Sequence, residues 1–193
     1  MRIKMNIISD TIIGSGQSVP GAEDITILVD REGFPYYKGG SLKGIFREEY
    51  SNLLYWNDCS EDEVKKELFN LLGSNGFSSD ADETKLRFTN FELSEAVKNV
   101  IRKEGLSANE VNEAFTTVRT FTAIDNDNGM VKEGSLRQAR CLKKGITLYG
   151  NITCSKEQEE TVKEVLSLIK WIGSMRNRGF GRVGFEIVRE ASR

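Results

Sequence analysis

The sequence predicts an α+β fold built around a split βαβ arrangement, and three observations support this expectation. Several short segments alternate apolar with polar residues, as half-buried strands do. Longer segments show the apolar spacing of amphipathic helices. These segments follow one another in the order strand, helix, strands, strand, helix, strand, with extra material between them.

The first half of the chain is expected to open with a strand over residues 2–9 (RIKMNIIS). A glycine-rich loop over 14–24 and a short strand over 25–29 should follow, and then a turn with an extended segment over 31–37. Residues 41–56 (SLKGIFREEYSNLLYW) place their large apolar residues on one helical face. We therefore expect the first long helix there, with Ser41 as its N-cap.

A second amphipathic helix is expected over 61–73, ending at Gly73, with a polar loop over 74–84 after it. The remaining segments are expected as follows: a strand over 85–94, mixed helix signals over 95–115, a strand-like segment over 116–124, an exposed hairpin or long loop over 124–145, a strand over 146–154, a helix over 156–173 capped by Ser155, and a final strand over 181–190. This order is that of a ferredoxin-like (RRM-like) fold, whose sheet packs its helices on one face. At 193 residues, we expect a single domain spanning 1–193.

The composition excludes several classes of protein. With 38% apolar and 29% charged residues, the chain is expected to be soluble and globular. No apolar run approaches the roughly 18 to 20 residues of a membrane span, so we expect no membrane association. The three cysteines form no CxxC pair, which fits a reducing cytoplasm. Histidine is absent, so catalysis would have to use carboxylates, lysine, tyrosine or a metal ion held by oxygen ligands.

Charge is unevenly distributed along the chain, although the net charge is −2. Residues 1–115 contain 13 Lys and Arg against 20 Asp and Glu, whereas residues 116–193 contain 14 against 9. A surface that binds a polyanion is compatible with this basic C-terminal part. Charges that merely solvate exposed faces are the alternative interpretation.

The segment GGSLKGIFR (39–47) brings glycines, a helix N-terminus and two cations together. Unpaired amides at the start of the helix, with Lys43 and Arg47 one turn apart, suit a phosphate backbone. An ordinary capped helix with solvated basic residues is the alternative.

The segment SMRNRGFGRV (174–183) contains three arginines and two glycines ahead of the last strand. Arg176, Arg178 and Arg182 can contact phosphates, and Gly179 and Gly181 allow the backbone to approach a ligand closely. Phe180, between the two glycines, is a candidate for stacking on a base. A plain hairpin connector is the alternative, although three arginines in seven residues exceed what a connector needs.

The pair GFPYYKGGSLKGIFREEY and SMRNRGFGRVGF resembles the RAMP superfamily of CRISPR proteins. The first matches that family's G-x-P-x-x-x-G-S-S-L-K-G-x-x-R helix start, with GGS at 39–41 where the family usually has GSS, and the second matches its C-terminal glycine-rich loop. TAIDNDNGMVKEGSLRQARCLKKGITLYGNI resembles the projecting thumb hairpin and following strand of type III backbone subunits. LFNLLGS followed by KLRFTNFELS resembles the family's LFG stretch and its strand. The resemblance runs over most of the chain.

The resemblance implies a backbone subunit of a type III CRISPR effector. Its partners would be the CRISPR guide RNA, the target RNA, copies of itself and other type III effector subunits. Ser41, Lys43 and Arg47 at the helix start and the 176–182 loop would grip the guide backbone. A thumb-like insertion at about 120–145 would wedge into the guide–target duplex through Ile124, Met130 or Val131, while Lys132 and Arg137 touch phosphate.

The same resemblance implies a catalytic site in the loop after the first strand. Asp24 occupies the place of the aspartate with which catalytic backbone subunits cut target RNA, and it would both catalyse and bind Mg²⁺ or another divalent cation. Its neighbour Glu23 is a possible second carboxylate, and a shift of one position in the alignment would move the catalytic role to it. A turn or cap residue is the alternative interpretation of an aspartate in such a loop.

Three further functions remain open from the residues. The first is a non-catalytic RAMP subunit that only binds or caps the guide RNA. The second is the guide-processing endonuclease branch, which fits poorly because that branch usually has two such domains and often a histidine. The third is a ferredoxin-like domain that mediates protein contacts without RNA.

Overall fold

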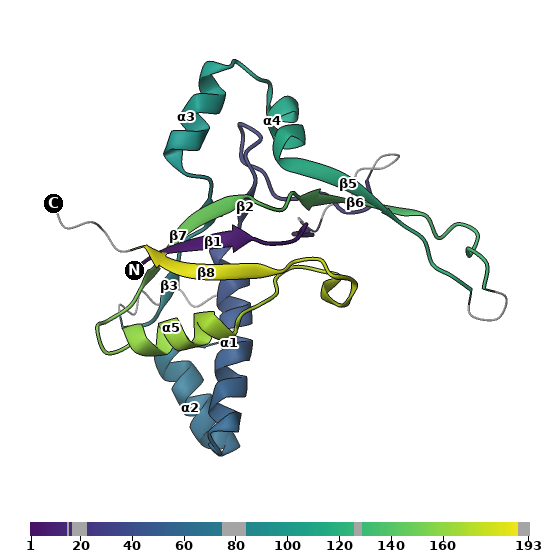
Figure 1. Cartoon of the computed structure of the whole chain (residues 1–193). Coiled ribbons are helices and arrows are strands. Elements are labelled where there is room, and N and C mark those ends of the chain that lie inside the picture. The colour runs from purple at the N-terminus through teal and green to yellow at the C-terminus, as the bar shows by residue number, and fades with distance from the viewer. Residues whose placement is uncertain (15, 17–22, 75–83, 126–128, 189–193) are drawn as a thin grey trace.

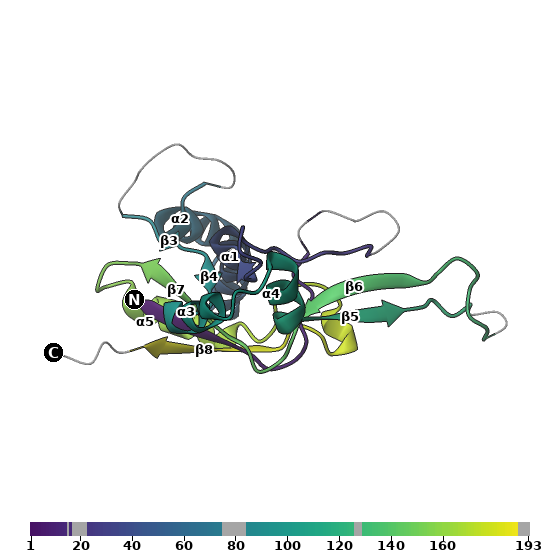
Figure 2. The same cartoon turned by 90° about the horizontal axis from the view of Figure 1, so that it is seen from above.

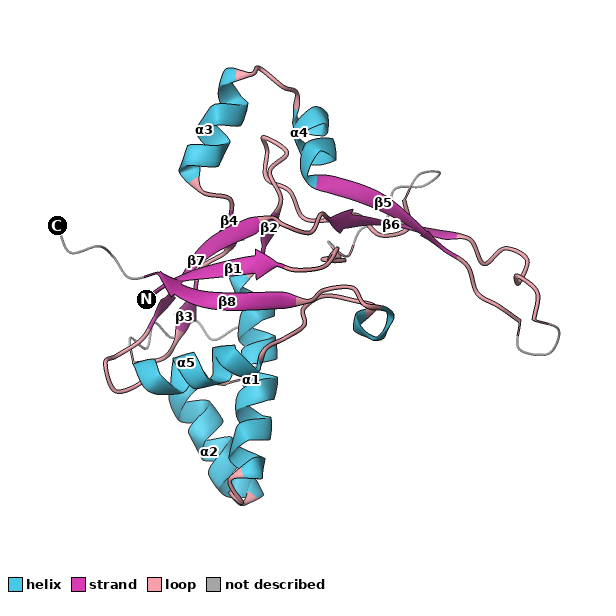
Figure 3. Cartoon of the chain, viewed as in Figure 1, coloured by secondary structure: helices cyan, strands magenta, loops and turns pink. Residues whose placement is uncertain are grey.

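An antiparallel sheet forms the centre of the fold, and the computed structural model describes it within residues 1–14, 16, 23–74, 84–125 and 129–188. The strands are β1 (Arg2–Ile7), β2 (Tyr36–Tyr37), β3 (Arg87–Phe88), β4 (Phe91–Glu92), β5 (Thr116–Phe121), β6 (Arg137–Leu142), β7 (Thr147–Thr153) and β8 (Val183–Val188). The helices are α1 (Gly39–Trp56), α2 (Glu61–Leu72), α3 (Glu95–Lys103), α4 (Ala108–Phe115) and α5 (Glu159–Leu168), with a 3-10 turn η1 (Arg176–Arg178). Figures 1 and 3 show their arrangement.

The strand order confirms the ferredoxin-like fold. The sheet runs β2-β4-β7-β1-β8, and β3 also pairs with β7. The central strand β1 is antiparallel to both neighbours, with Met5 opposite Leu148 of β7 and Phe185 of β8. Both neighbours of β1, β7 and β8, therefore come from the second half of the chain. This is the split βαβ topology expected from the order of the elements.

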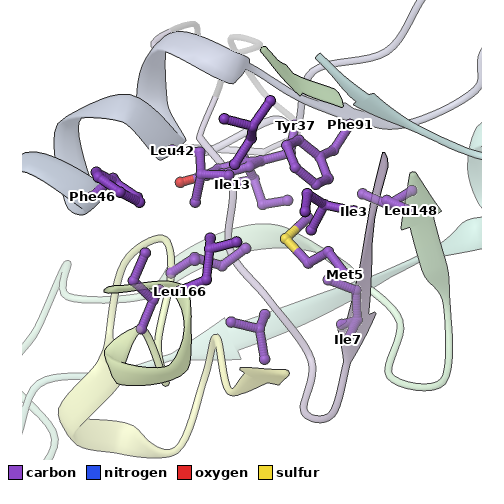
Figure 4. Close-up of a cluster of buried hydrophobic side chains, with 14 of the residues drawn as sticks. Ile3, Met5, Ile7, Ile13, Tyr37, Leu42, Phe46, Phe91, Leu148 and Leu166 are labelled. Carbon is purple, nitrogen blue, oxygen red and sulfur yellow. The ribbon is translucent and has the colours of Figure 1, made fainter. Parts of the chain in front are cut away.

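One face of the sheet is covered by α1, α2 and α5 (Figure 1). The alternation in β1 buries Ile3, Met5 and Ile7 completely or nearly so. These side chains face Leu42 and Phe46 of α1 across the core (Figure 4). Burial of this apolar surface is the main force that holds the helix layer to the sheet.

A two-stranded hairpin, β5 and β6, projects away from the body of the domain (Figures 1 and 2). Its register pairs Thr116 with Leu142 at the inner end and Phe121 with Arg137 at the base of the projecting tip. Beyond these strands, Ile124 and Val131 form an isolated bridge near the tip. The exposed hairpin expected over 124–145 therefore contains the tip and the second strand of a longer hairpin that begins at residue 116.

Helices α3 and α4 form a separate arm on the side of β2 and β4 (Figure 3). Lys98 anchors this arm: it is 5% exposed, donates to Glu92 at 2.7 Å and lies 3.8 Å from Asp30. Burial acts to lower the pKa of Lys98, but the hydrogen bond and charge of Glu92 and the neighbouring carboxylates raise it overall. The mixed helix signals over 95–115 therefore correspond to two short helices, and the ion pairs of the buried Lys98 hold the first of them, α3.

The first helix begins earlier than its sequence predicts. Gly39 is its first residue and Ser41 its third, and the N-cap is Lys38 without a side-chain hydrogen bond. A Cβ on Gly39 would lie 2.4 Å from the carbonyl oxygens of Phe88 and Thr89. The prediction of Ser41 as N-cap is wrong because packing against the β3–β4 turn, which needs a glycine, sets the start of the helix.

Three other boundaries also differ from expectation. The helix predicted over 156–173 is shorter and starts after Gln158, whose side chain accepts a hydrogen bond from Ser155 N. The predicted strand over 85–94 is divided into β3 and β4, and 25–29 forms isolated bridges rather than a strand. The 14–24 loop, the 74–84 loop and the last residues of the 181–190 strand lie partly outside the described residues. Within the described ranges, no helix has the length and apolar character that crossing a bilayer requires.

Candidate nucleic-acid interface

An open pocket lies where the loop after β1 meets the start of α1 and the turn before η1. We call it the Asp24 pocket; its volume is about 610 Å³, and its lining residues are Ile13, Gly14, Gly16, Asp24, Ile25, Tyr37, Ser41, Gly173 and Ser174. Two residues predicted from sequence, Asp24 and Ser41, are thus brought together although 17 positions separate them. Gly173 and Ser174, at the start of the glycine-rich loop, line the same pocket.

A second pocket lies between the hairpin and the glycine-rich loop. We call it the hairpin-base pocket; its volume is about 640 Å³, and its lining residues are Phe121, Thr122, Ala123, Lys132, Glu133, Gly134, Ser135, Arg137, Met175, Asn177 and Arg178. Three predicted phosphate ligands, Lys132, Arg137 and Arg178, line this one pocket, and all three are exposed. The two pockets adjoin, because Ser174 lines the first and Met175 lines the second.

Asp24 is exposed, and its position is set by the hairpin. Its backbone N–H donates to the carbonyl oxygen of Gln138 at 2.9 Å, and its carboxylate Oδ2 accepts from Gln138 N at 2.7 Å. The neighbouring Glu23 is engaged differently: its carboxylate accepts from Nε and Nη2 of Arg140 on β6. Of the two carboxylates considered from sequence, Asp24 faces a pocket and Glu23 is held in an ion pair.

Fewer backbone amides are unpaired at the start of α1 than its sequence predicts. Gly39 N donates to Oδ1 of Asn90 at 3.1 Å, and Ser41 N donates to Lys38 O at 3.0 Å. The expectation of unpaired amides is therefore wrong for these two groups. The Ser41 side chain nevertheless lies at the Asp24 pocket.

Lys43 and Arg47 are half-buried on α1. Nη2 of Arg47 donates to the carbonyl oxygen of Gly73 at 2.8 Å, which ties α1 to the end of α2. Burial lowers the pKa of both groups, and the charge of Arg47 lowers the pKa of Lys43 further. A phosphate nearby would relieve this unfavourable environment of Lys43.

The glycine-rich loop is shaped by left-handed residues. Met175, Gly179 and Gly181 have φ values of 57°, 84° and 84°. A Cβ on Gly181 would lie 2.0 Å from the carbonyl oxygen of Ile172, so only glycine fits there. Gly181 N also donates to Asp10 O at 2.9 Å, which binds the loop to the segment after β1.

The arginines of this loop are exposed side chains on an anchored backbone. Arg176 Nε donates to Gly173 O at 3.2 Å, and Arg182 N donates to the Ser9 hydroxyl at 2.9 Å. Arg178 lines the hairpin-base pocket together with the two hairpin cations. The loop therefore presents three exposed guanidinium groups on a backbone that is held by hydrogen bonds.

Phe180 has a structural contact that sequence did not predict. It is half-buried and lies edge-to-face against Phe121, with ring centroids 5.5 Å apart. This pair, together with Ile12, Ala139 and Cys141, forms a small apolar cluster under the hairpin. The Phe180 ring is thus used to support the hairpin.

The tip of the hairpin carries the apolar side chains expected of a wedge. Ile124, Met130 and Val131 are 65%, 66% and 62% exposed, which is unusual for residues of this type. Residues 126–128 lie outside the described residues.

Tyr37 and Arg140 are site residues that sequence reasoning missed. Tyr37 lines the Asp24 pocket, and burial raises its pKa to about 12. Arg140 links Glu23 to the hairpin, as noted above. Tyr37 lies in the quoted GFPYYKGG motif, but no local signal indicates that Arg140 would meet a residue 117 positions away.

The side chains at the Asp24 pocket supply only part of the ligand set that a divalent cation needs. Among the described residues, no group of three or more acidic or sulfur side chains is arranged so that it could hold a metal ion. Asp24 alone offers an exposed carboxylate at the pocket. Mg²⁺ commonly uses one or two carboxylates and completes its shell with waters and substrate phosphates. The residues present therefore fit a cation shared with a bound RNA, held by Asp24, and do not form an all-protein cage.

Comparison with known proteins agrees with this architecture. A sequence model described as the RAMP superfamily matches residues 4–184. A chain of the "Cryo-EM structure of the Type III-B Cmr-beta bound to cognate target RNA" superposes with a TM-score of 0.67 at 14% identity, covering 96% of this chain and 95% of that chain. A chain of the "Type III-B Cmr-beta Cryo-EM structure of the Apo state" gives 0.66 at 15% identity with the same coverage. No curated protein matches the chain.

Proposed function

The chain belongs to the RAMP superfamily, and from this premise we propose that it is a guide-RNA-binding backbone subunit of a type III CRISPR effector that cuts complementary target RNA. The similar solved chains come from type III-B complexes, one of them bound to cognate target RNA. Its partners would be the guide RNA, the target RNA, copies of itself and other effector subunits. Such a complex would work in the cytoplasm.

The basic surface around the hairpin-base pocket supports the RNA-binding part of the proposal. Lys132, Arg137 and Arg178 come from two separate elements and surround one open hollow. Arg176 and Arg182 extend this surface along the glycine-rich loop. Phosphates of a single strand attract such an array, and the release of their counterions would make the affinity depend strongly on salt.

The observation that carries the nuclease part is the place of Asp24. Its exposed carboxylate lines a pocket walled by both glycine-rich segments, where a strand gripped by them would pass. In the cleavage step, the 2′-oxygen of a target nucleotide bonds to the adjacent phosphorus, and the bond to the 5′-oxygen breaks. The carboxylate of Asp24 accepts the 2′-hydroxyl proton, and the leaving 5′-oxygen takes a proton from water.

A divalent cation bound at Asp24 would neutralise charge that develops on the phosphate during this step. The protein's own contribution is to fix the carboxylate and the RNA backbone relative to each other. Hydrogen bonds exchanged with the Gln138 backbone orient Asp24, and the glycine-rich loop holds the strand. Positioning of this kind supplies much of the rate enhancement in reactions that need in-line geometry.

A non-catalytic subunit that only binds or caps the guide RNA is the second candidate. It is favoured by the fact that, among the described residues, no group of three or more acidic side chains is arranged to hold a metal ion. It is also favoured by the hydrogen bond that Oδ2 of Asp24 accepts from Gln138 N, which gives this carboxylate a structural role in joining its loop to β6. The two candidates share the RNA surface and differ only in the role of Asp24.

Target-RNA cleavage by the assembled guide complex, with and without Mg²⁺, separates the two candidates. Asp24→Ala should lower the single-turnover cutting rate by about 100-fold or more and leave target binding intact, because a general base supplies rate and little affinity. Asp62→Ala, at an exposed aspartate in the first turn of α2, is the matched control and should cut at the natural rate. Binding without regularly spaced cuts by the natural chain would refute the nuclease and leave the guide-binding subunit.

A further inference from the structure

Residues 23–25 run beside β6 as an added strip of backbone on the hairpin. Ile25 forms a parallel bridge with Ala139, and Arg140 N donates to Ile25 O at 2.9 Å. The two hydrogen bonds between Asp24 and Gln138 belong to the same strip. The segment that carries the candidate catalytic carboxylate is therefore joined to the projecting hairpin.

Arg140 reinforces this junction with its side chain. Its Nε and Nη2 donate to the two oxygens of Glu23, and its Nη1 donates to the Thr116 hydroxyl at 2.9 Å. That hydroxyl in turn donates to Asn112 O of α4 at 2.6 Å. One guanidinium thus connects the Asp24 segment, both hairpin strands and the helix that precedes them.

The Glu23–Arg140 pair is well shielded from water. The side chains of Arg140 and Glu23 are 17% and 11% exposed. Two-pronged guanidinium–carboxylate contacts fix geometry as well as charge. Removing one member of a shielded pair leaves the other charge without compensation, so either loss should disturb the segment.

We propose that Arg140 is a positioning residue for target cleavage, which holds Glu23 and thereby keeps the adjacent Asp24 carboxylate at its pocket. The inference rests on the proposed nuclease function. It assigns Glu23 to anchoring rather than to metal binding or proton transfer. It also means that the hairpin and the candidate catalytic carboxylate move together. The position that the hairpin takes against RNA therefore determines the position of Asp24.

Single-turnover cleavage and target affinity of the assembled guide complex test this role. Arg140→Ala and Glu23→Gln should each slow cutting by about 10- to 100-fold, because displacing a reacting group by about 1 Å can cost that much. Target affinity should change by less than about 2-fold. The double variant should cut no more slowly than the slower single variant, because both changes break the same contact. Arg140→Lys, which keeps the charge but has a single donor nitrogen, should restore part of the rate.

Hydrogen–deuterium exchange without RNA supplies an independent readout. Exchange over residues 23–25 should be faster in Arg140→Ala than in the natural chain. Arg87→Ala is the matched control, since Arg87 is an exposed arginine on β3, which pairs with β7 in the main sheet. It should leave both the exchange and the cutting rate unchanged.

The outcomes separate this inference from the proposed function. Natural cutting that needs Asp24 but persists at full rate in Arg140→Ala would overturn the positioning role alone. Loss of cutting in Glu23→Gln with retention in Arg140→Ala would also overturn it, because Glu23 would then act directly on RNA or metal. Absence of cutting by the natural chain would overturn the nuclease function and the positioning role together.

Discussion

The three cations around the hairpin-base pocket should each neutralise one phosphate of a bound single strand. We consider the triple variant Lys132→Gln, Arg137→Gln and Arg178→Gln, which removes the exposed positive charges that line this pocket. For single strands, the logarithm of affinity falls with the logarithm of salt concentration by about 0.7 per phosphate contact. The triple variant should therefore have a slope shallower by about 2.

This difference in slope corresponds to a readily measured difference in RNA affinity. Between about 50 and 200 mM salt, the natural chain should lose roughly 20-fold more affinity than the triple variant. Fluorescence anisotropy with a labelled single-stranded RNA measures both slopes, and sedimentation confirms that each chain is monodisperse.

A charge-matched control rules out a general effect of net charge. Lys65→Gln, Lys66→Gln and Lys156→Gln remove three exposed cations on α2 and just before α5, in the helix layer. This control should retain the natural slope, because these residues line neither pocket. Equal slopes in the natural chain and the pocket variant would refute the assignment of the RNA surface.

Two further predictions concern stability. Gly181→Ala should destabilise the fold by about 2 kcal/mol or more in urea unfolding, because its Cβ would lie 2.0 Å from Ile172 O at a φ of 84°. Gly179→Ala has the same φ but open space around it, so a cost of about 1 kcal/mol is expected, and equal costs would contradict the steric argument. Burial acts to raise the pKa of Asp10, but hydrogen bonds from Arg119 and the Lys144 amide bring it below its ordinary value of 3.8. Ionised Asp10 therefore stabilises the fold above that value, and this stability is lost as the pH falls through the lower folded-state pKa. Asp10→Asn should lower the melting temperature near neutral pH and flatten its decline between about pH 5 and pH 2; an unchanged acid decline would contradict this linkage.

The elements with strong local signals were predicted well. The helix over 61–73 ends at its glycine as expected, since Gly73 is the C-cap of α2. The apolar face of the first long helix is buried at Leu42, Phe46 and Tyr50. Both follow from periodicity and terminal residues, which act within a few positions of the chain.

The elements that depend on distant contacts were predicted less well. The start of α1 is decided by the turn at Thr89, about 50 residues away in sequence, and not by the serine within the helix. Phe180 packs against Phe121 across a gap of 59 positions. No local pattern carries such information, because tertiary packing overrides the preferences of single segments.

The candidate site shows the same division. Sequence identified the residue types and segments: Asp24, the helix start and the arginine–glycine loop. Only the tertiary structure decided that Asp24 lines a pocket with Ser41, and that Glu23 is held by Arg140 instead.

The sequence by itself determined the kinds of element, their order and the basic character of the C-terminal part. Apolar periods of 2 and 3.6 residues and the terminal residues of helices are local properties, so they can be recognised without knowledge of the fold. The tertiary structure decided which segments meet. The contact between Asp24 and Gln138 spans 114 positions, and one of its two hydrogen bonds, from Asp24 N to Gln138 O, is independent of side-chain identity. Backbone pairing of this kind leaves no residue pattern in the sequence, and it is what joins the candidate catalytic carboxylate to the hairpin.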